Sequence, residues 1–138
     1  MGGLVGGGTN TGSTTFVDNC VFEGNLGYED MHFYFTYVGG IAGQLYSKIT
    51  NCKSKGYLYG DSYVGGIVGG ANSSGDYGDI SLNSFVGTIK ARSSYIGGIA
   101  GNAVSHRMEK NYVQADILSF NGSLSYVGGI VGQVNGIS

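Results

Sequence analysis

The segment Tyr63-Val64-Gly65-Gly66-Ile67-Val68-Gly69 decides the fold, because its central phrase recurs along the chain. The phrase consists of Gly-Gly, a bulky aliphatic residue, Val or Ala, and a final Gly. Its five copies begin 26 to 37 residues apart, at Gly2, Gly39, Gly65, Gly97 and Gly128. Such a recurrence marks a repeat architecture, in which units stack because none can bury its apolar face alone. The sequence therefore predicts stacked coils.

A second phrase recurs between these copies, namely an Asn followed by Cys, Ser or Tyr. Aligned on the Asn, it reads Asn19-Cys20, Asn51-Cys52, Asn83-Ser84 and Asn111-Tyr112. From the second copy on, a Tyr precedes the aliphatic residue before each Gly-Gly, at Tyr37, Tyr63, Tyr95 and Tyr126. We interpret the repeated residues as structural, and the set comprises Gly39, Gly40, Gly43, Gly65, Gly66, Gly69, Gly97, Gly98, Gly101, Asn19, Asn51, Asn83 and Asn111.

The composition favours an all-β chain. It has 28 Gly and no Pro among 138 residues, and 41% of the residues are hydrophobic. The segments between turn residues are short and rich in Val, Ile and Tyr, and none shows a sustained helical period with caps. We predict one repeat domain over 1–138, with repeats at about 2–38, 39–64, 65–96 and 97–127 and a half-copy at 128–138.

Side-chain parity raises a difficulty at the Gly-Gly pair. On an ideal strand Val64 and Val68 share one side, while Ile67 points to the other. A bulge or corner at Gly65-Gly66 would reset the alternation, and paired glycines suit it because they tolerate positive φ. The alternative is a strand covered on both faces.

The two phrases resemble the GLUG motif repeats of bacterial surface proteins. Those repeats occur in large adhesin-like proteins and in the non-catalytic regions of IgA-cleaving metalloproteases, and the resemblance covers nearly the whole chain. It implies a right-handed parallel β-helix, here of about four coils, in an extracellular or cell-surface bacterial setting. The resemblance supplies no catalytic residues.

Charge and hydropathy exclude some partners. The net charge is −2, and without a basic stripe to neutralise phosphates nucleic acid is not an expected partner. No apolar run is long enough for a membrane helix, and no signal peptide opens the chain. Both ends fall within a repeat and lack polar caps, so we expect a segment of a longer protein whose coil ends self-associate.

The two cysteines occupy equivalent places in neighbouring repeats. Stacked coils would bring the Cα atoms of Cys20 and Cys52 to about 4.8 Å, which is within the range of disulfides. Side chains on adjacent parallel strands run side by side, however, so a free buried thiol pair and a disulfide both stay open. Zinc would need further ligands, and His32 and His106 are not spaced to supply them. We expect no metal and no cofactor.

The acidic residues suggest little chemistry. A β-helix glycosidase or lyase would need paired carboxylates on one sheet face. The close pairs are Asp76 with Asp79 and Glu29 with Asp30, and both lie in predicted loops. Solvated turn residues are the main interpretation of these acids, and a calcium-holding loop is the alternative.

One segment departs from the repeat and supplies the candidate ligand-binding residues. It lies between Asn19 and Gly39 and contains Tyr28, Glu29, Asp30, His32, Phe33 and Tyr34. Loop insertions on a rigid scaffold are where binding groups gather, although these aromatics could instead pack onto the coil. The Tyr column is open to the same two interpretations, an aromatic stack or an exposed row for sugar rings.

These observations predict a non-catalytic structural or adhesion module, a rigid stalk that presents loops to a glycan or protein on a host or cell surface. The alternative in another class is a carbohydrate-binding module that uses the loop aromatics. A polysaccharide-degrading enzyme that uses Asp76 and Asp79 is the third hypothesis.

Overall fold

The computed structural model describes residues 1–7, 16–27, 35–46, 48–73, 78–120 and 124–135. These residues form strands and turns, and none of them belongs to a helix that could cross a bilayer. The strands pair in parallel to form four sheets, which makes the chain a β-solenoid of about three turns. The predicted all-β parallel fold is confirmed, and its right-handedness stays a prediction.

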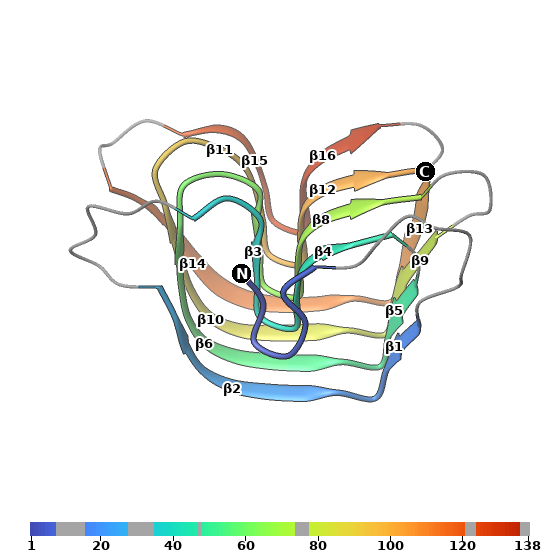
Figure 1. Cartoon of the computed structure of the whole chain (residues 1–138). Coiled ribbons are helices and arrows are strands. Elements are labelled where there is room, and N and C mark those ends of the chain that lie inside the picture. Colours follow the sequence, from blue (N-terminus) through green and yellow to red (C-terminus); the bar gives the residue numbers. More distant parts are fainter. Residues whose placement is uncertain (8–15, 28–34, 47, 74–77, 121–123, 136–138) are drawn as a thin grey trace.

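Each turn of the chain passes the four sheets in the same order (Figure 1). Sheet 1 contains β1 (Phe16–Asp18), β5 (Lys48–Thr50), β9 (Gly78–Ser81) and β13 (His106–Glu109). Sheet 2 contains β2 (Val21–Leu26), β6 (Lys53–Gly60), β10 (Ser84–Ala91) and β14 (Tyr112–Ser119). Sheet 3 contains β3 (Val38–Gly39), β7 (Val64–Gly65), β11 (Ser94–Gly97) and β15 (Ser125–Gly128). Sheet 4 contains β4 (Ala42–Leu45), β8 (Val68–Asn72), β12 (Ala100–Val104) and β16 (Val131–Asn135).

Residues at equivalent places in successive repeats are direct neighbours across the strands. Val38 pairs with Val64, Val64 with Ile96, and Ile96 with Val127. The first copy of the repeated phrase continues the stack, because Gly2 and Val5 form parallel bridges to Gly39 and Ala42. Stacking of the copies, the main prediction from the sequence, is therefore confirmed.

The Gly-Gly pair is a corner at which the chain turns inside the molecule. In Figure 1, the chain descends from sheet 3 to the centre of the coil and rises again into sheet 4. The turn reaches the inner face of sheet 2, where a Cβ at Gly66 would collide with the ring of Phe85. Sheets 3 and 4 also approach closely, since a Cβ at Gly69 would lie 2.6 Å from the carbonyl oxygen of Tyr63.

The corner explains how side chains on both sides of an ideal strand can all face the core, but positive φ at the glycines is not the reason. Val64, Ile67 and Val68 are all fully buried, because the chain reverses between them. Neither Gly65 nor Gly66 has positive φ, so the expectation that the pair is chosen for positive φ is wrong. Glycine is required there because backbone approaches backbone, which leaves no room for a Cβ.

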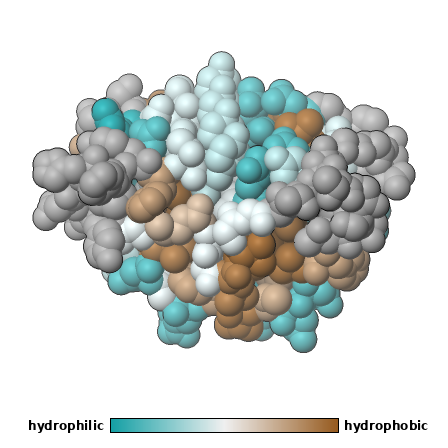
Figure 2. Space-filling model, viewed as in Figure 1, coloured by the Kyte–Doolittle hydropathy of each residue, from teal (hydrophilic) through white to brown (hydrophobic). Residues whose placement is uncertain are grey.

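The core lies inside the solenoid, and the apolar residues of each coil are fully buried only where another coil lies on both sides. Ile41, Ile67 and Ile99 are 0% exposed, whereas Ile130 in the last copy is 39% exposed. At the other end, Phe22 in β2 is only partly buried, whereas Phe85, two coils further on in the same inward column, is 0% exposed. Figure 2 shows apolar surface at the lower centre, in the region of β2 in the same view as Figure 1. The apolar face of each coil is thus buried by the coils beside it.

Candidate functional site

The candidate ligand-binding residues of the sequence lie outside the described residues. This applies to Tyr28, Glu29, Asp30, His32, Phe33 and Tyr34, and also to Asp76 of the proposed acidic pair. Their roles therefore stay predictions. The polar and aromatic columns of the repeat can be followed residue by residue, because they lie within the described strands and corners.

The predicted Asn column is in fact two columns. Lys53 pairs with Ser84 and Thr50 with Ser81, so the two residues at this corner, 51 and 52, align with 82 and 83. Asn19 and Asn51 therefore share a column with Leu82 and Lys110. These four residues have positive φ, at 55°, 53°, 59° and 55° in that order.

The second column contains Cys20, Cys52, Asn83 and Asn111. The single Asn column of the sequence alignment is therefore wrong by one residue for Asn83 and Asn111. The physical reason is that the two pairs do different things. Asn19 and Asn51 occupy a left-handed backbone position that Asn tolerates. Asn83 and Asn111 instead point their side-chain amides into the interior of the corner.

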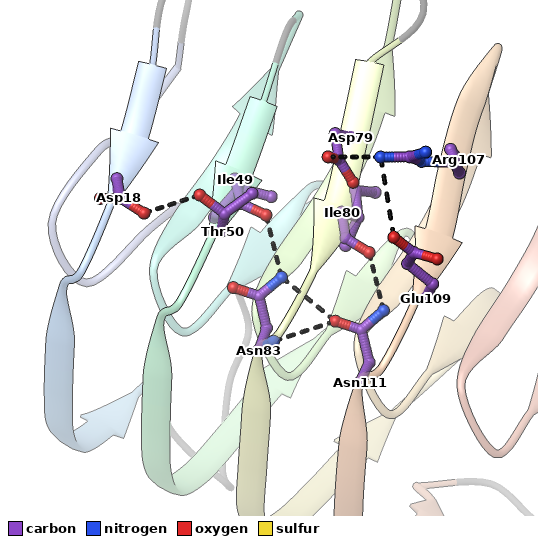
Figure 3. Close-up of polar contacts among 9 residues, drawn as sticks. All are labelled: Asp18, Ile49, Thr50, Asp79, Ile80, Asn83, Arg107, Glu109 and Asn111. Carbon is purple, nitrogen blue, oxygen red and sulfur yellow. Dashed lines mark hydrogen bonds and ion pairs between the residues drawn. The ribbon is translucent and has the colours of Figure 1, made fainter.

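The amides of Asn83 and Asn111 form a hydrogen-bonded ladder between coils (Figure 3). The Oδ1 of Asn83 accepts a bond from the Cys52 amide at 2.9 Å, and its Nδ2 donates to the Ile49 carbonyl at 2.9 Å. Asn111 repeats this pattern one coil later. Its Oδ1 accepts a bond from the backbone amide of Asn83 at 3.1 Å, and its Nδ2 donates to the Ile80 carbonyl at 2.7 Å. Each of the two side-chain amides thus bonds to the backbone of the coil before it.

We expect Asn83→Ala to lower the free energy of unfolding by about 2 kcal/mol, because a buried amide and a buried carbonyl would lose their partners. Denaturant unfolding followed by circular dichroism measures this value. Asn135→Ala, at an exposed position of β16, is the matched control and should change stability by less than about 0.5 kcal/mol. Equal effects of the two substitutions would contradict the ladder's role.

The tyrosines that precede the Gly-Gly corners form a continuous aromatic stack. The ring centroids of Tyr37 and Tyr63 are 4.6 Å apart, those of Tyr63 and Tyr95 4.6 Å, and those of Tyr95 and Tyr126 5.0 Å. Tyr126 is 57% exposed at the open end of the stack. Because the faces of the inner rings cover one another, they are closed to sugar rings, which favours the aromatic-stack interpretation of this column.

The tyrosine stack also sits at an unusual backbone position. The φ angles of Tyr37, Tyr63, Tyr95 and Tyr126 lie between 53° and 63°. This left-handed region is uncommon for a bulky residue and costs on the order of 1 kcal/mol at each position. The stack therefore has to offset a local backbone cost at every coil.

Both cysteines have free thiols, with Cys20 half-buried and Cys52 buried. Each donates to a carbonyl two residues before it, Cys20 to Asp18 at 3.4 Å and Cys52 to Thr50 at 3.2 Å. Burial raises the pKa of the Cys52 thiol to about 11. Of the two alternatives, the structure has the free thiol pair.

We expect iodoacetamide at pH 8 to alkylate Cys20 well before Cys52. A thiol of pKa about 11 is only about 0.1% ionised at that pH, and the thiolate is the reacting form. Peptide mass spectrometry of timed samples gives the two rates, and unfolding in urea should make them similar. Alkylation of Cys52 as fast as Cys20 in the folded protein would show that Cys52 is not buried.

Charged side chains of sheet 1 make ion pairs and hydrogen bonds within and between neighbouring strands. Arg107 lies 3.3 Å from Asp79 and 3.7 Å from Glu109 (Figure 3). Asp18 accepts hydrogen bonds from Asn51 at 3.0 Å and Thr50 at 2.7 Å, and these bonds lower the pKa of its carboxyl. Within the described ranges, no three His, Cys, Asp or Glu side chains gather as a metal site would require.

His106 is a buried structural residue. It is 1% exposed, and its Nδ1 lies 2.7 Å from the Val104 carbonyl oxygen. Its ring lies against Gly78, its partner in β9, where a Cβ would collide with the imidazole. The glycine at 78 is therefore required by the histidine of the next coil.

Comparison with known families identifies one segment of the chain. Residues 36–56 match the family model described as "Glug: The GLUG motif". The chain contains a GLUG motif. In the structure, this motif runs from Tyr37 through the Gly-Gly corner, along β4 and β5, and into β6 as far as Gly56. No curated protein and no solved structure gives a significant match to the chain.

The geometry explains what the GLUG motif encodes. Its glycines form the inward corner, its Tyr supplies one ring of the stack, and Cys52 within it accepts the next coil's backbone bond, from the Ser84 amide at 2.9 Å. The motif therefore covers most of one turn of a parallel β-solenoid and includes several of the contacts that join it to its neighbours.

Proposed function

We propose that this GLUG-motif solenoid is a non-catalytic structural module, a stiff segment that holds binding surfaces away from the place where its parent protein is anchored. One observation carries the proposal, namely the unbroken register of all four sheets from coil to coil. The amide ladder and the tyrosine stack add contacts along the same axis. Each coil is thus joined to the next at several points around its circumference.

Such a construction suits a stalk on a bacterial surface, where a protein is loaded along its length. Extracellular or cell-surface location is part of the proposal. Contacts confined to nearest neighbours make the stability of a solenoid nearly a sum over its coils. Under load, the coils should therefore separate one after another.

Single-molecule force spectroscopy tests the mechanical part of this proposal. With handles at both termini, we expect stepwise lengthening of about 100 Å per coil, the extended length of roughly 30 residues. Tyr63→Ala should lower the force of these steps, and Phe16→Ala, which removes a 61% exposed ring of sheet 1, should not. Unravelling without measurable resistance would contradict a load-bearing role.

The proposal that the module is non-catalytic is tested separately, by incubating the chain with a panel of neutral and acidic polysaccharides. We expect no release of reducing ends. Turnover that is lost in Asp79→Asn would instead support the polysaccharide-cleaving hypothesis. The 3.3 Å ion pair with Arg107 supports a structural role for Asp79, because it occupies one carboxylate oxygen.

A further inference from the structure

A groove of about 430 Å³ crosses the outer face of sheet 2, over β6, β10 and β14. Its floor contains Gly56 and Gly87, which pair with each other in register. Lys55 and Gln114 belong to the column on one side of this floor, and Tyr57 and Asp116 to the column on the other. The tyrosine stack, the amide ladder and the Gly-Gly corners lie elsewhere.

The groove exists because the backbone of sheet 2 bends at its glycines. Gly56 and Gly87 have φ angles of 142° and 152°, in a region that only glycine occupies readily. A Cβ at Gly87 would collide with the Gly56 carbonyl oxygen, and a Cβ at Gly56 with that of Gly24. Neither Gly56 nor Gly87 can therefore be replaced by a residue with a side chain, and their register partner in β14, Ala115, has only a methyl group. The hollow is thus preorganised rather than induced.

The walls combine an aromatic surface with hydrogen-bonding groups of both kinds. Tyr57 is 50% exposed. Lys55 donates, the carboxylate of Asp116 accepts, and the amide of Gln114 does both. The phenol of Tyr112 lies 3.2 Å from the Gln114 Oε1 and holds this amide in place. Ligand sites typically combine apolar surface with a few polar groups of this sort.

The chemistry of the groove selects its occupant. A peptide cannot add as a strand at the floor, because β6 and β10 are paired on both sides within the sheet. The charges of Lys55 and Asp116 offset each other, and Glu23 is the register partner of Lys55, so the walls carry no positive excess for an anionic polymer. A neutral sugar ring, with apolar C–H faces and a rim of hydroxyls, matches both the tyrosine and the polar groups.

The geometry points to a binding site for a neutral oligosaccharide in this groove, with one sugar ring against Tyr57. Three strands span about 10 Å between the outer two, which accommodates roughly two sugar rings. The site is independent of the stalk function and lies outside the loop that sequence analysis assigned to binding. Its open shape predicts weak binding, with Kd in the range of about 0.1 to 5 mM.

NMR titration of the intact chain tests this site, with cellohexaose, xylohexaose, maltohexaose and mannohexaose as probes and hexagalacturonate as the anionic comparison. We expect at least one neutral probe to shift the amides of Gly56 and Gly87. Tyr57→Ala should weaken its binding about tenfold or more, and Asp116→Asn should weaken it too. Phe16→Ala, an exposed aromatic on sheet 1, is the matched control and should bind normally.

Three results would overturn the site. The first is that none of the neutral probes binds below about 10 mM. The second is binding that survives Tyr57→Ala but is lost in Tyr34→Ala, which would place the sugar at the loop. The third is tighter binding of hexagalacturonate than of every neutral probe. Melting curves for each variant show that a loss of binding is not a loss of fold.

Discussion

Gly66→Ala should lower the free energy of unfolding by about 3 kcal/mol or more. The new Cβ would meet the carbonyl oxygen of Gly98 and the ring of Phe85, and both are held in place by the neighbouring coil and the opposite sheet. Backbone conformation is not the cause, because φ at Gly66 is not in the left-handed region. The clash could be relieved only if the coil that contains Gly98 moved away from the coil that contains Gly66, which would break the register of sheets 3 and 4.

Gly129→Ala is the matched control for this prediction. Gly129 occupies the same place in the last copy of the phrase, but nothing lies within 4 Å of its Cβ position. Its replacement should change stability by less than about 0.5 kcal/mol. Thermal and denaturant unfolding of the two variants give the comparison. Equal effects at the two positions would show that stacking of the next coil is not what requires the glycine.

Tyr63→Ala should lower the free energy of unfolding by about 3 kcal/mol. Tyr63 loses two stacked partners, Tyr37 and Tyr95, each worth about 1 kcal/mol beyond the area that they bury. The alanine still has to adopt the left-handed backbone conformation, so the local cost stays while the compensation disappears. Denaturant unfolding measures the loss.

Two variants separate stacking from other causes. Tyr63→Phe keeps the ring and should cost less than about 1 kcal/mol. Tyr126→Ala removes an end ring with one stacked partner, 57% exposed, and should cost about 1 kcal/mol. A loss in Tyr126→Ala as large as in Tyr63→Ala would contradict the stack as the stabilising element.

The fold could be predicted because its information is repeated. Five copies of one phrase imply that Ile41, Ile67 and Ile99 occupy the same environment, and stacking is the arrangement that buries all of them. The role of the Gly-Gly pair could not be predicted. A glycine needed for close packing and a glycine needed for positive φ look the same in a sequence, and the packing partner, Phe85, lies on another sheet.

The error in the Asn column left a signal in the spacing. Asn51 precedes the glycine of its repeat, Gly56, by five residues, whereas Asn83 precedes Gly87 by four. Because Gly56 and Gly87 pair in register, the two Asn residues cannot share a column. Alignment on the glycine rather than on the more conspicuous Asn would have placed Asn83 beside Cys52.

The groove on sheet 2 was missed for a different reason. Its walls come from three coils, so Lys55, Tyr57 and Asp116 are separated by up to about 60 residues in sequence and form no motif. Aromatic residues attract attention where they cluster, as at Tyr28 to Tyr34. The exposed Tyr57, whose only near aromatic neighbour in the sequence is Tyr59, becomes significant only when a glycine bend is found beside it.

The distance between spin labels at Val21 and Tyr112 tests the stacking of the repeats most directly. Both residues are exposed, and they are the first and last members of one register column of sheet 2, with Lys53 and Ser84 between them. Genetically encoded labels avoid the native thiols. Stacked coils predict backbones about 15 Å apart, three strand spacings, and a narrow distance distribution below about 25 Å. A distribution centred beyond about 35 Å would show that the copies do not lie on one another.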